Sequence, residues 1–292
     1  YGLGLDVKLS DKKTSVLRID YVDDVFAAGR FSSNLWDQQM RLRDLNLDLY
    51  NANFYHSRSF GVSYLYDVSN SLTVKLALNR EDQEALFDYQ YRNLGNSFQN
   101  SSATLSLKYA PNDKNIMTPS GKFTFERKYP QFFANLETGG EVFGGDLSYY
   151  RLDALLMHQF KTKLGVSNIK IFGGISSGTA PIWKKFEIAG MREFNPDKWY
   201  SNINTPSNLG FVTMPAGTFY ADRFAAFSFS HTLPFRFKTI GNRLSSIELE
   251  YQAAIGGFKN RTDHQFAFQP LDHYYQEAGI VWNRFLGRSF GV

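Results

Sequence analysis

The chain of 292 residues contains no cysteine. This absence excludes a disulfide framework, thiolate catalysis and cysteine-based metal sites. No apolar run approaches the ~18 residues that a membrane-spanning helix needs. Long runs of one charge sign are also missing, and the formal net charge is only +4. Because this net positive charge is small and the cations are mixed with acids, nucleic acid is not an expected partner.

Groups that suggest catalysis or metal binding are sparse. Ser228, Ser230 and His231 are neighbours in sequence, but Ser230 and His231 are adjacent in a predicted strand and so face opposite sides. None of the histidines has metal-ligand spacing, and we interpret them as interfacial or turn residues: His56, His158, His231, His264 and His273. The sequence therefore predicts a protein that is not an enzyme and holds neither a metal nor another cofactor.

Strict two-residue alternation of apolar and polar side chains dominates what is present. In residues 71–80, Leu72, Val74, Leu76 and Leu78 alternate with polar or small neighbours. Successive strand residues face opposite sides, so such a segment has one apolar and one polar face. The pattern recurs along the chain, and 16% of the residues are aromatic. An all-β transmembrane antiparallel β-barrel explains both facts, because its strands alternate and its aromatics form interfacial girdles. A large soluble sandwich or propeller is the alternative.

Alternation and turn residues predict 13 strands, with two long polar excursions at 22–43 and 178–217 that we expect to be extracellular loops. The glycine pair Gly173 and Gly174 is expected to mark a bulge or kink in the wall. The predicted strands are 1–9, 15–21, 44–54, 59–68, 72–80, 84–94, 101–110, 122–129, 145–160, 167–177, 218–232, 245–258 and 274–285.

The chain is expected to be one barrel domain, 1–292, cut from a longer protein. It begins at Tyr1 and stops at Val292, and both ends lie within predicted strands. No segment resembles a signal peptide, so an export signal is expected upstream.

From residue 118 to 194 the sequence carries landmarks in a fixed order. They are a turn with Pro119 and Gly121, a strand, the run Tyr149, Tyr150 and Arg151, a second strand, and a loop containing Pro181, Phe186, Gly190, Arg192 and Phe194. This order resembles the C-terminal barrel of the BamA/TamA superfamily of outer-membrane assembly and secretion proteins. The resemblance implies about 16 strands in the full protein, within the known range of bacterial barrels. Residues 178–217 would form the long extracellular loop that folds toward the lumen.

The loop departs from the family pattern at its tip. Where the family has two glycines and then an arginine–glycine pair, this chain has Ala189 and Gly190, and Glu193 follows Arg192. In the family the loop arginine pairs with acidic residues on following strands. Arg192 matches that arginine, and Glu248 and Glu250 on a predicted polar face are its expected partners; a solvated Arg192 is the alternative.

The C-terminal quarter shows a finer resemblance. The segments 231–237, 271–279 and 283–287 resemble uncharacterised envelope barrels that carry a carboxypeptidase-like regulatory domain, a small β-sandwich. If that holds, the upstream part would be such a sandwich rather than the POTRA repeats of assembly factors.

The resemblance implies a place in the bacterial outer membrane and a role in envelope biogenesis. The protein would insert or export other proteins, or serve as the barrel subunit of a larger complex. Its partners would be outer-membrane lipid and other outer-membrane proteins or lipoproteins. Two alternatives remain open: a passive porin-like channel, and a structural scaffold barrel that binds a surface partner through its loops.

Overall fold

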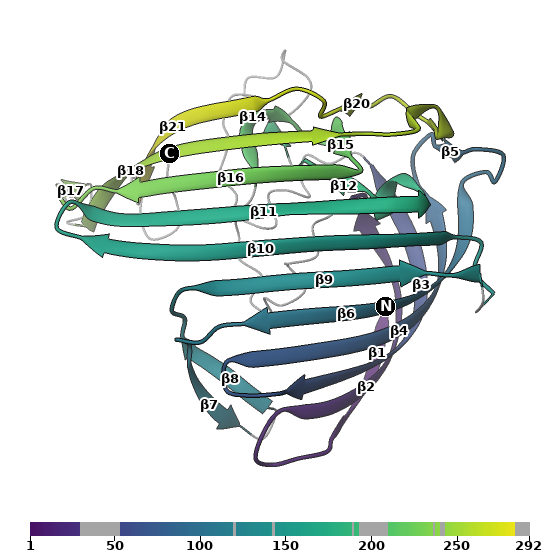
Figure 1. Cartoon of the computed structure of the whole chain (residues 1–292), viewed down its shortest axis with the longest axis horizontal. Helices are drawn as coiled ribbons and strands as arrows, with labels where there is room; N and C mark the ends of the chain where they lie inside the picture. The colour runs from purple at the N-terminus through teal and green to yellow at the C-terminus, as the bar shows by residue number, and fades with distance from the viewer. Residues whose placement is uncertain are drawn as a thin grey trace.

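The computed structural model describes residues 1–29, 53–118, 121–141, 144–188, 190–192, 210–235, 237–239 and 243–283. A single curved antiparallel sheet of 12 strands forms the wall, which confirms the predicted all-β barrel fold (Figure 1). In sheet order the wall contains β1 (Gly2–Lys8), β2 (Ser15–Ala27), β3 (Phe54–Asp67), β4 (Leu72–Ala85), β6 (Ser97–Tyr109), β9 (Gln131–Gly139), β10 (Ser148–Thr162), β11 (Gly165–Thr179), β16 (Arg223–Thr232), β18 (Arg243–Gly257), and, both paired to β18, β17 (Phe237–Thr239) and β21 (Tyr275–Asn283).

Short elements complete the described chain. They are β5 (Gln90–Tyr91), β7 (Lys114–Thr118), β8 (Gly121–Glu126), the 3-10 helix η3 (Ile182–Lys184), β12 (Phe186–Glu187), β13 (Gly190–Arg192), β14 (Phe211–Pro215), β15 (Phe219–Ala221), the 3-10 helix η5 (Arg261–Asp263), β19 (His264–Gln265) and β20 (Gln269–Pro270). Within the described ranges, no helix has the length and apolar character needed to cross a bilayer.

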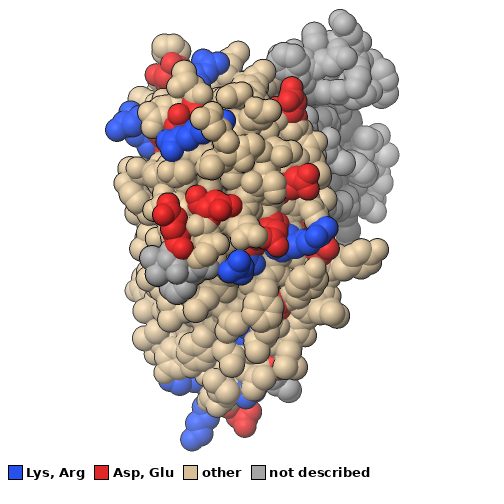
Figure 2. All heavy atoms as spheres, turned by 90° about the vertical axis from the view of Figure 1, so that its right-hand side faces the viewer, with Lys and Arg blue, Asp and Glu red and all other residues tan. Residues whose placement is uncertain are grey.

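The connections divide the barrel into two ends. The turns between β3 and β4 and between β10 and β11 are tight and lie at one end, which we call the turn end. The long connections after β2, β4, β11 and β18 lie at the other, which we call the loop end and which is on the right in Figure 1. Figure 2 looks onto the loop end, where carboxylates and cations lie interspersed on the surface.

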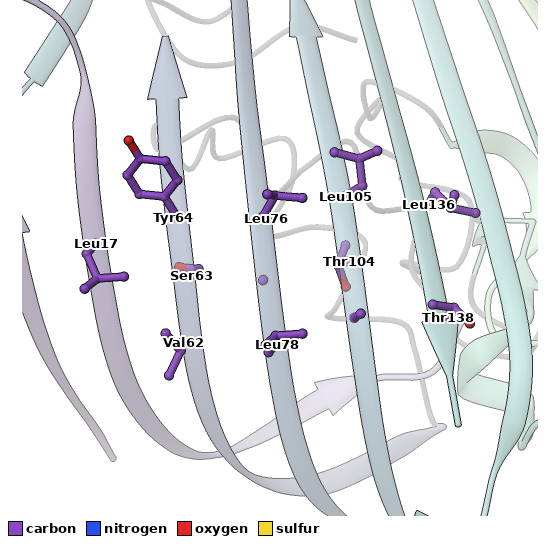
Figure 3. Close-up of a pocket in the computed structure, with 12 residues that line it drawn as sticks. Leu17, Val62, Ser63, Tyr64, Leu76, Leu78, Thr104, Leu105, Leu136 and Thr138 are labelled. Carbon is purple, nitrogen blue, oxygen red and sulfur yellow. The ribbon is translucent and has the colours of Figure 1, made fainter. Parts of the chain in front are cut away.

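Strand register places the predicted apolar face on the outside of the wall. Leu76 on β4 lies opposite Tyr64 on β3 and Leu105 on β6, so side chains of one row share one face. Leu76 is 53% exposed and Leu78 is 62% exposed. Around them the outer wall has a shallow apolar hollow of about 400 Å³, lined by side chains of β2, β3, β4, β6 and β9 (Figure 3). These exposed apolar rows are the lipid-facing surface of the barrel.

Outward-facing side chains change character toward the loop end. The row of Tyr21, Phe60 and Arg80 follows the leucine rows and places two aromatic rings at their margin. Beyond it, Asp82 and Glu84 face outward from β4 and are exposed. Aromatic residues mark the membrane–water interface of barrels, so β2, β3 and β4 project past the bilayer on this side.

Several strand predictions need correction. The strand predicted at 84–94 is wrong, because β4 itself continues to Ala85 and residues 86–96 form a connection that contains only β5. The loop predicted at 22–43 starts too early, since β2 runs to Ala27. Most of the strand predicted at 44–54 lies outside the described residues. The segment 122–129 forms β8, which pairs with β7 outside the wall, and the wall strand is β9, which was missed.

The predicted bulge at Gly173 and Gly174 is also wrong. β11 pairs with β10 in continuous register through both residues. A Cβ on Gly174 would lie 2.4 Å from the ring of Phe186, and one on Gly173 would lie 2.6 Å from the carbonyl oxygen of Phe224. The glycines therefore admit close neighbours and form no bulge, whereas a kink at this point stays a prediction.

The assignment of the lipid face leads to a first prediction. Leu76→Arg places a charge in the middle of the apolar rows and should lower the free energy of unfolding by about 2–4 kcal/mol. Glu84→Arg, beyond the aromatic row, is the matched control and should change it by about 0–1 kcal/mol. Urea unfolding of the protein refolded into lipid vesicles measures both. Equal effects of the two variants would contradict the assignment.

Candidate functional site

A segment of the connection that follows β11 lies against the inner face of the wall. Residues 180–188 are all buried. Pro181 precedes η3 as its N-cap with extended backbone, and a three-residue turn then presents Ile182, Trp183 and Lys184 to the interior. We call residues 180–188 the inner segment. Its burial shows that protein occupies this part of the lumen.

Lys184 joins the inner segment to two wall strands. Its Nζ lies 2.7 Å from Oε1 of Glu137 on β9 and 3.3 Å from Oε2 of Glu81 on β4. Burial alone would lower the pKa of Lys184, but the two carboxylates outweigh burial and raise that pKa well above its usual value. Lys184 is therefore charged at neutral pH.

Neighbouring polar groups donate further hydrogen bonds to the two carboxylates. The Tyr149 hydroxyl donates to Glu137. Asn100 Nδ2 donates to Glu81 Oε2 at 2.9 Å, and Gln83 also donates to that oxygen. A buried ion pair is stable only when its lone pairs and protons are paired in this way. We call Lys184, Glu81, Glu137, Tyr149, Asn100 and Gln83 the ionic cluster.

Trp183 adds a second attachment beside the ionic cluster. Its indole Nε1 donates to Oε1 of Gln83 at 2.7 Å. The ring of Tyr55 on β3 stacks on the indole at 5.0 Å between centroids and 11° between planes. Buried tryptophan is favourable where its N–H reaches an acceptor and its ring packs on another ring, and both conditions hold here.

Phe186 fixes the distal half of the inner segment. Its ring lies against Gly174 of β11, where a Cβ would clash. The guanidinium carbon of Arg151 lies 4.6 Å from the ring centroid, and the Phe224 ring lies 5.1 Å away. Phe186 was predicted as a loop landmark, and in the structure its ring packs against Gly174 and Arg151.

Two other loops cover the inner segment at the loop end. Tyr89 accepts a hydrogen bond from the Ile182 N–H at 2.9 Å, and Tyr91 accepts one from the Ala180 N–H at 3.1 Å. The Tyr89 hydroxyl also lies 2.9 Å from Nδ1 of His264. Burial lowers the pKa of His264 to about 3, so this ring is neutral.

Backbone pairing joins these two loops to each other. β5, in the β4–β6 connection, pairs with β19, in the β18–β21 connection. Arg92 Nη2 lies 2.8 Å from Asp263 Oδ2 at the edge of this pair. The inner segment is therefore enclosed between the wall and a two-loop cover.

The other predicted site residues lie near the inner segment. Gly190 is buried in β13 opposite Phe211, where a Cβ would lie 2.3 Å from the carbonyl oxygen of Pro215. The backbone of Arg192 pairs with Pro215, whereas its side chain and Phe194 lie outside what the structure describes. Glu248 and Glu250 lie on β18 opposite Val281 and Gly279, as part of the wall. The contact between Arg192 and these glutamates stays a prediction.

The sequence reasoning missed the ionic cluster. Glu81 and Gln83 continue the inward parity of Thr73 and Ala77, so extending the predicted strand beyond residue 80 would have placed both in the lumen. Lys184 gave no comparable signal, because its role depends on how the loop folds. Within the described ranges, no group of three or more His, Cys, Asp or Glu side chains could hold a metal ion.

Comparison with known proteins identifies the type of fold. A family model described as the C-terminal domain of a family of unknown function (DUF5686) matches residues 42–177. The structure of BamA from Haemophilus ducreyi lacking POTRA domains 1-3 is 11% identical, with a TM-score of 0.55, over 96% of this chain and 55% of that chain. No curated protein matches this chain.

Two further structures are similar at lower scores. CdiB from Acinetobacter baumannii is 10% identical, with a TM-score of 0.49, over 100% of this chain and 44% of that chain. LpxR from Salmonella typhimurium is 9% identical, with a TM-score of 0.32, over 97% and 87% of the two chains. The chain spans about half the length of the BamA and CdiB chains. The fold is that of an outer-membrane β-barrel.

The two adjacent lysines of the inner segment lead to opposite predictions. Lys184→Met leaves Glu81 and Glu137 buried without their cation and should lower the free energy of unfolding by about 3–5 kcal/mol. Lys185 is 6% exposed, and its burial lowers its pKa to about 8 despite the nearby Asp222. Lys185→Met should therefore leave stability equal or higher at pH 7. Urea unfolding of both variants in vesicles measures the difference.

The pH dependence of Lys185 has a defined sign. Its folded pKa lies below the ordinary value, so holding the charge costs stability at any pH below about 8. This cost disappears as the pH rises toward the ordinary lysine value. The stability advantage of Lys185→Met over the wild type should therefore shrink between pH 7 and pH 10. An advantage that grows over this range would contradict the assignment.

Proposed function

We propose that this chain is the barrel of a bacterial outer-membrane protein that acts in envelope biogenesis, inserting or exporting other proteins or serving as the barrel subunit of a larger complex. We further propose that it has no enzymatic activity and that outer-membrane lipid and other outer-membrane proteins or lipoproteins are its partners. The observation that carries this proposal is the filled lumen: residues 180–188 are buried against the inner wall and held by Lys184.

The filled lumen argues against the passive-channel alternative. A porin keeps a water-filled passage lined by polar side chains. Here the rings of Tyr55, Trp183 and Tyr89 pack in the interior, with Tyr89 and Trp183 5.3 Å apart between centroids. Displacing them would break the ionic cluster and uncover apolar surface. A barrel whose lumen is occupied until it acts on a client protein agrees with a role in assembly or export.

The barrel fold supports the proposal more weakly. BamA shares the fold at 11% identity, which shows architecture and not activity. The scaffold alternative uses the same closed barrel, with the loops as the binding surface. It differs in predicting that other outer-membrane barrels assemble normally without this protein.

Conductance tests whether the lumen is closed. The full-length protein in planar bilayers should show no steady large conductance. A variant carrying Glu81→Gln, Glu137→Gln and Lys184→Met should release the inner segment and show frequent open events, whereas Lys185→Met should behave as wild type. Steady large conductance of the wild-type protein, unchanged in the triple variant, would favour the porin alternative.

Depletion tests the role in biogenesis. Cells depleted of the protein should lose several other barrel proteins from the outer membrane, as measured by quantitative mass spectrometry of isolated membranes. The wild-type gene should restore them, and Lys185→Met should do so equally well. An unchanged outer-membrane composition after complete depletion would sink the assembly role and leave the scaffold interpretation.

A further inference from the structure

The connection between β6 and β9 contains a hairpin that is not part of the 12-stranded wall. In the described part of the chain, β7 pairs only with β8, in a two-stranded sheet at the turn end (Figure 1). A tight turn would have sufficed to join β6 to β9, because the two strands are neighbours in the wall. The hairpin is therefore an addition to the barrel, and its surface calls for an explanation.

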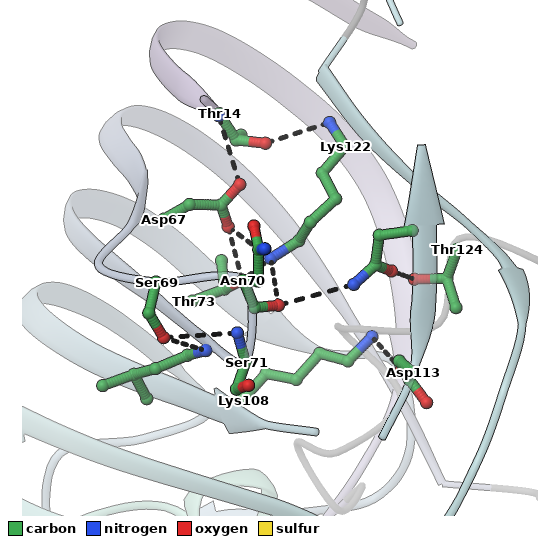
Figure 4. Close-up of polar contacts among 12 residues, drawn as sticks. Thr14, Asp67, Ser69, Asn70, Ser71, Thr73, Lys108, Asp113, Lys122 and Thr124 are labelled. Atoms are coloured by element: carbon green, nitrogen blue, oxygen red, sulfur yellow. Dashed lines mark hydrogen bonds and ion pairs between the residues drawn. The ribbon is translucent and has the colours of Figure 1, made fainter. Parts of the chain in front are cut away.

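One face of the hairpin is fastened to the inner margin of the wall. Lys122 Nζ lies 2.7 Å from Asp67 Oδ1 and 2.9 Å from Thr73 Oγ1, and its N–H donates to Thr14 Oγ1 at 3.0 Å. Thr124 donates to Asn115 Oδ1 at 2.7 Å on the same face. Figure 4 shows these contacts reaching from the hairpin to the turns of β2, β3 and β4.

Hydrogen bonds to Asp113 also hold the base of the hairpin. Asp113 Oδ1 accepts hydrogen bonds from the Lys128 N–H and from Gln131 Nε2, both at 2.8 Å. Lys108 Nζ lies 3.8 Å from the other Asp113 oxygen. A surface built on an immobilised hairpin loses little conformational entropy when it binds.

The opposite face of the hairpin is apolar and uncovered. Ile116 lies directly opposite Phe123, and Phe125 follows on the same side of β8. They are 50%, 48% and 55% exposed. Because Thr73 and Asp67 face the interior side of the wall, the hairpin approaches from that side, and this second face points away from the lipid. Membrane contact therefore does not account for its exposed phenylalanines.

The turn end, to which this apolar face belongs, carries an excess of cations. The turn-end segments 8–14, 66–73, 108–131 and 160–166 carry ten Lys and Arg and only four Asp and Glu. By contrast, five Lys and Arg and seven Asp and Glu occur in the loop-end segments 86–96, 140–147, 180–188, 216–222 and 258–273. An apolar surface on a basic end of the barrel complements a partner that has both acidic and apolar residues.

We propose that the β7–β8 hairpin is a docking surface for an acidic polypeptide segment that places apolar side chains on Ile116, Phe123 and Phe125. The segment binds at the turn end, which is the periplasmic end if the barrel lies in the outer membrane. The inference rests on the barrel fold and on this surface, and it stands whether or not the barrel assembles other proteins.

Photo-crosslinking in cells tests the proposal. Benzoylphenylalanine replaces Phe125 in the full-length protein, and in a matched control it replaces Phe160, which is 43% exposed on the outer face near the turn end. Phe125 should give a discrete protein adduct whose cross-linked peptide, mapped by mass spectrometry, carries net negative charge and apolar residues. Phe160 should give lipid adducts.

Charge reversal provides the second arm. Lys12→Glu combined with Lys128→Glu should reduce the protein adduct about tenfold, while Lys161→Glu with Lys163→Glu, farther along the turn end, should reduce it less. Heat-modifiable migration on gels confirms that each variant has folded. The proposal is overturned if Phe125 gives lipid adducts only, if it gives no adduct, or if the adduct is insensitive to charge reversal.

Discussion

One buried ammonium group holds the interior of this barrel in place. Lys184 lies between Glu81 and Glu137, which belong to β4 and β9 on either side of β6. Moving any one of the three charges into the interior alone would cost several kcal/mol. Together with the surrounding hydrogen bonds they become stable, but only in one geometry. The position of the inner segment, and therefore the closure of the lumen, depends on that geometry.

The filled lumen also explains the pattern of the wall. Around Ile188 of the inner segment the inner face is apolar: Phe133, Leu155 and Phe172 point inward and form one cluster with it. Around Lys184 the inner face carries the polar and charged groups of the ionic cluster. Nearer the turn end, the inner face of β4 carries the half-buried polar residues Lys75 and Asn79. A barrel wall that encloses its own loop needs two kinds of inner surface, and this chain has both.

Whether the inner face of a strand is polar or apolar decides how well that strand could be predicted from the sequence. Alternation located the strands whose inner face is polar, and β4 is the clearest case. It failed at β9, because Phe132 faces lipid and the adjacent Phe133 faces the inner cluster, which hides the two-residue period. The landmarks Pro181 and Phe186 lie in the inner segment, but the cation that holds it was not foreseen. Lys184 and Lys185 are identical neighbours in sequence, and only the fold brings Lys184 into ion pairs with two carboxylates while burial lowers the pKa of Lys185.

The pairing of β5 with β19 joins two loops whose parent strands are separated in the wall by β9, β10, β11 and β16. The wall between them is an arc, and the pair forms a chord across it. The length of a chord fixes the curvature of its arc, so the barrel cannot flatten or widen at this end while the two loops stay joined. Any rearrangement that changes the cross-section must first separate β5 from β19, where Tyr91 and Gln90 pair with His264 and Gln265. A few residues at the rim thus set the shape of a wall many times their size.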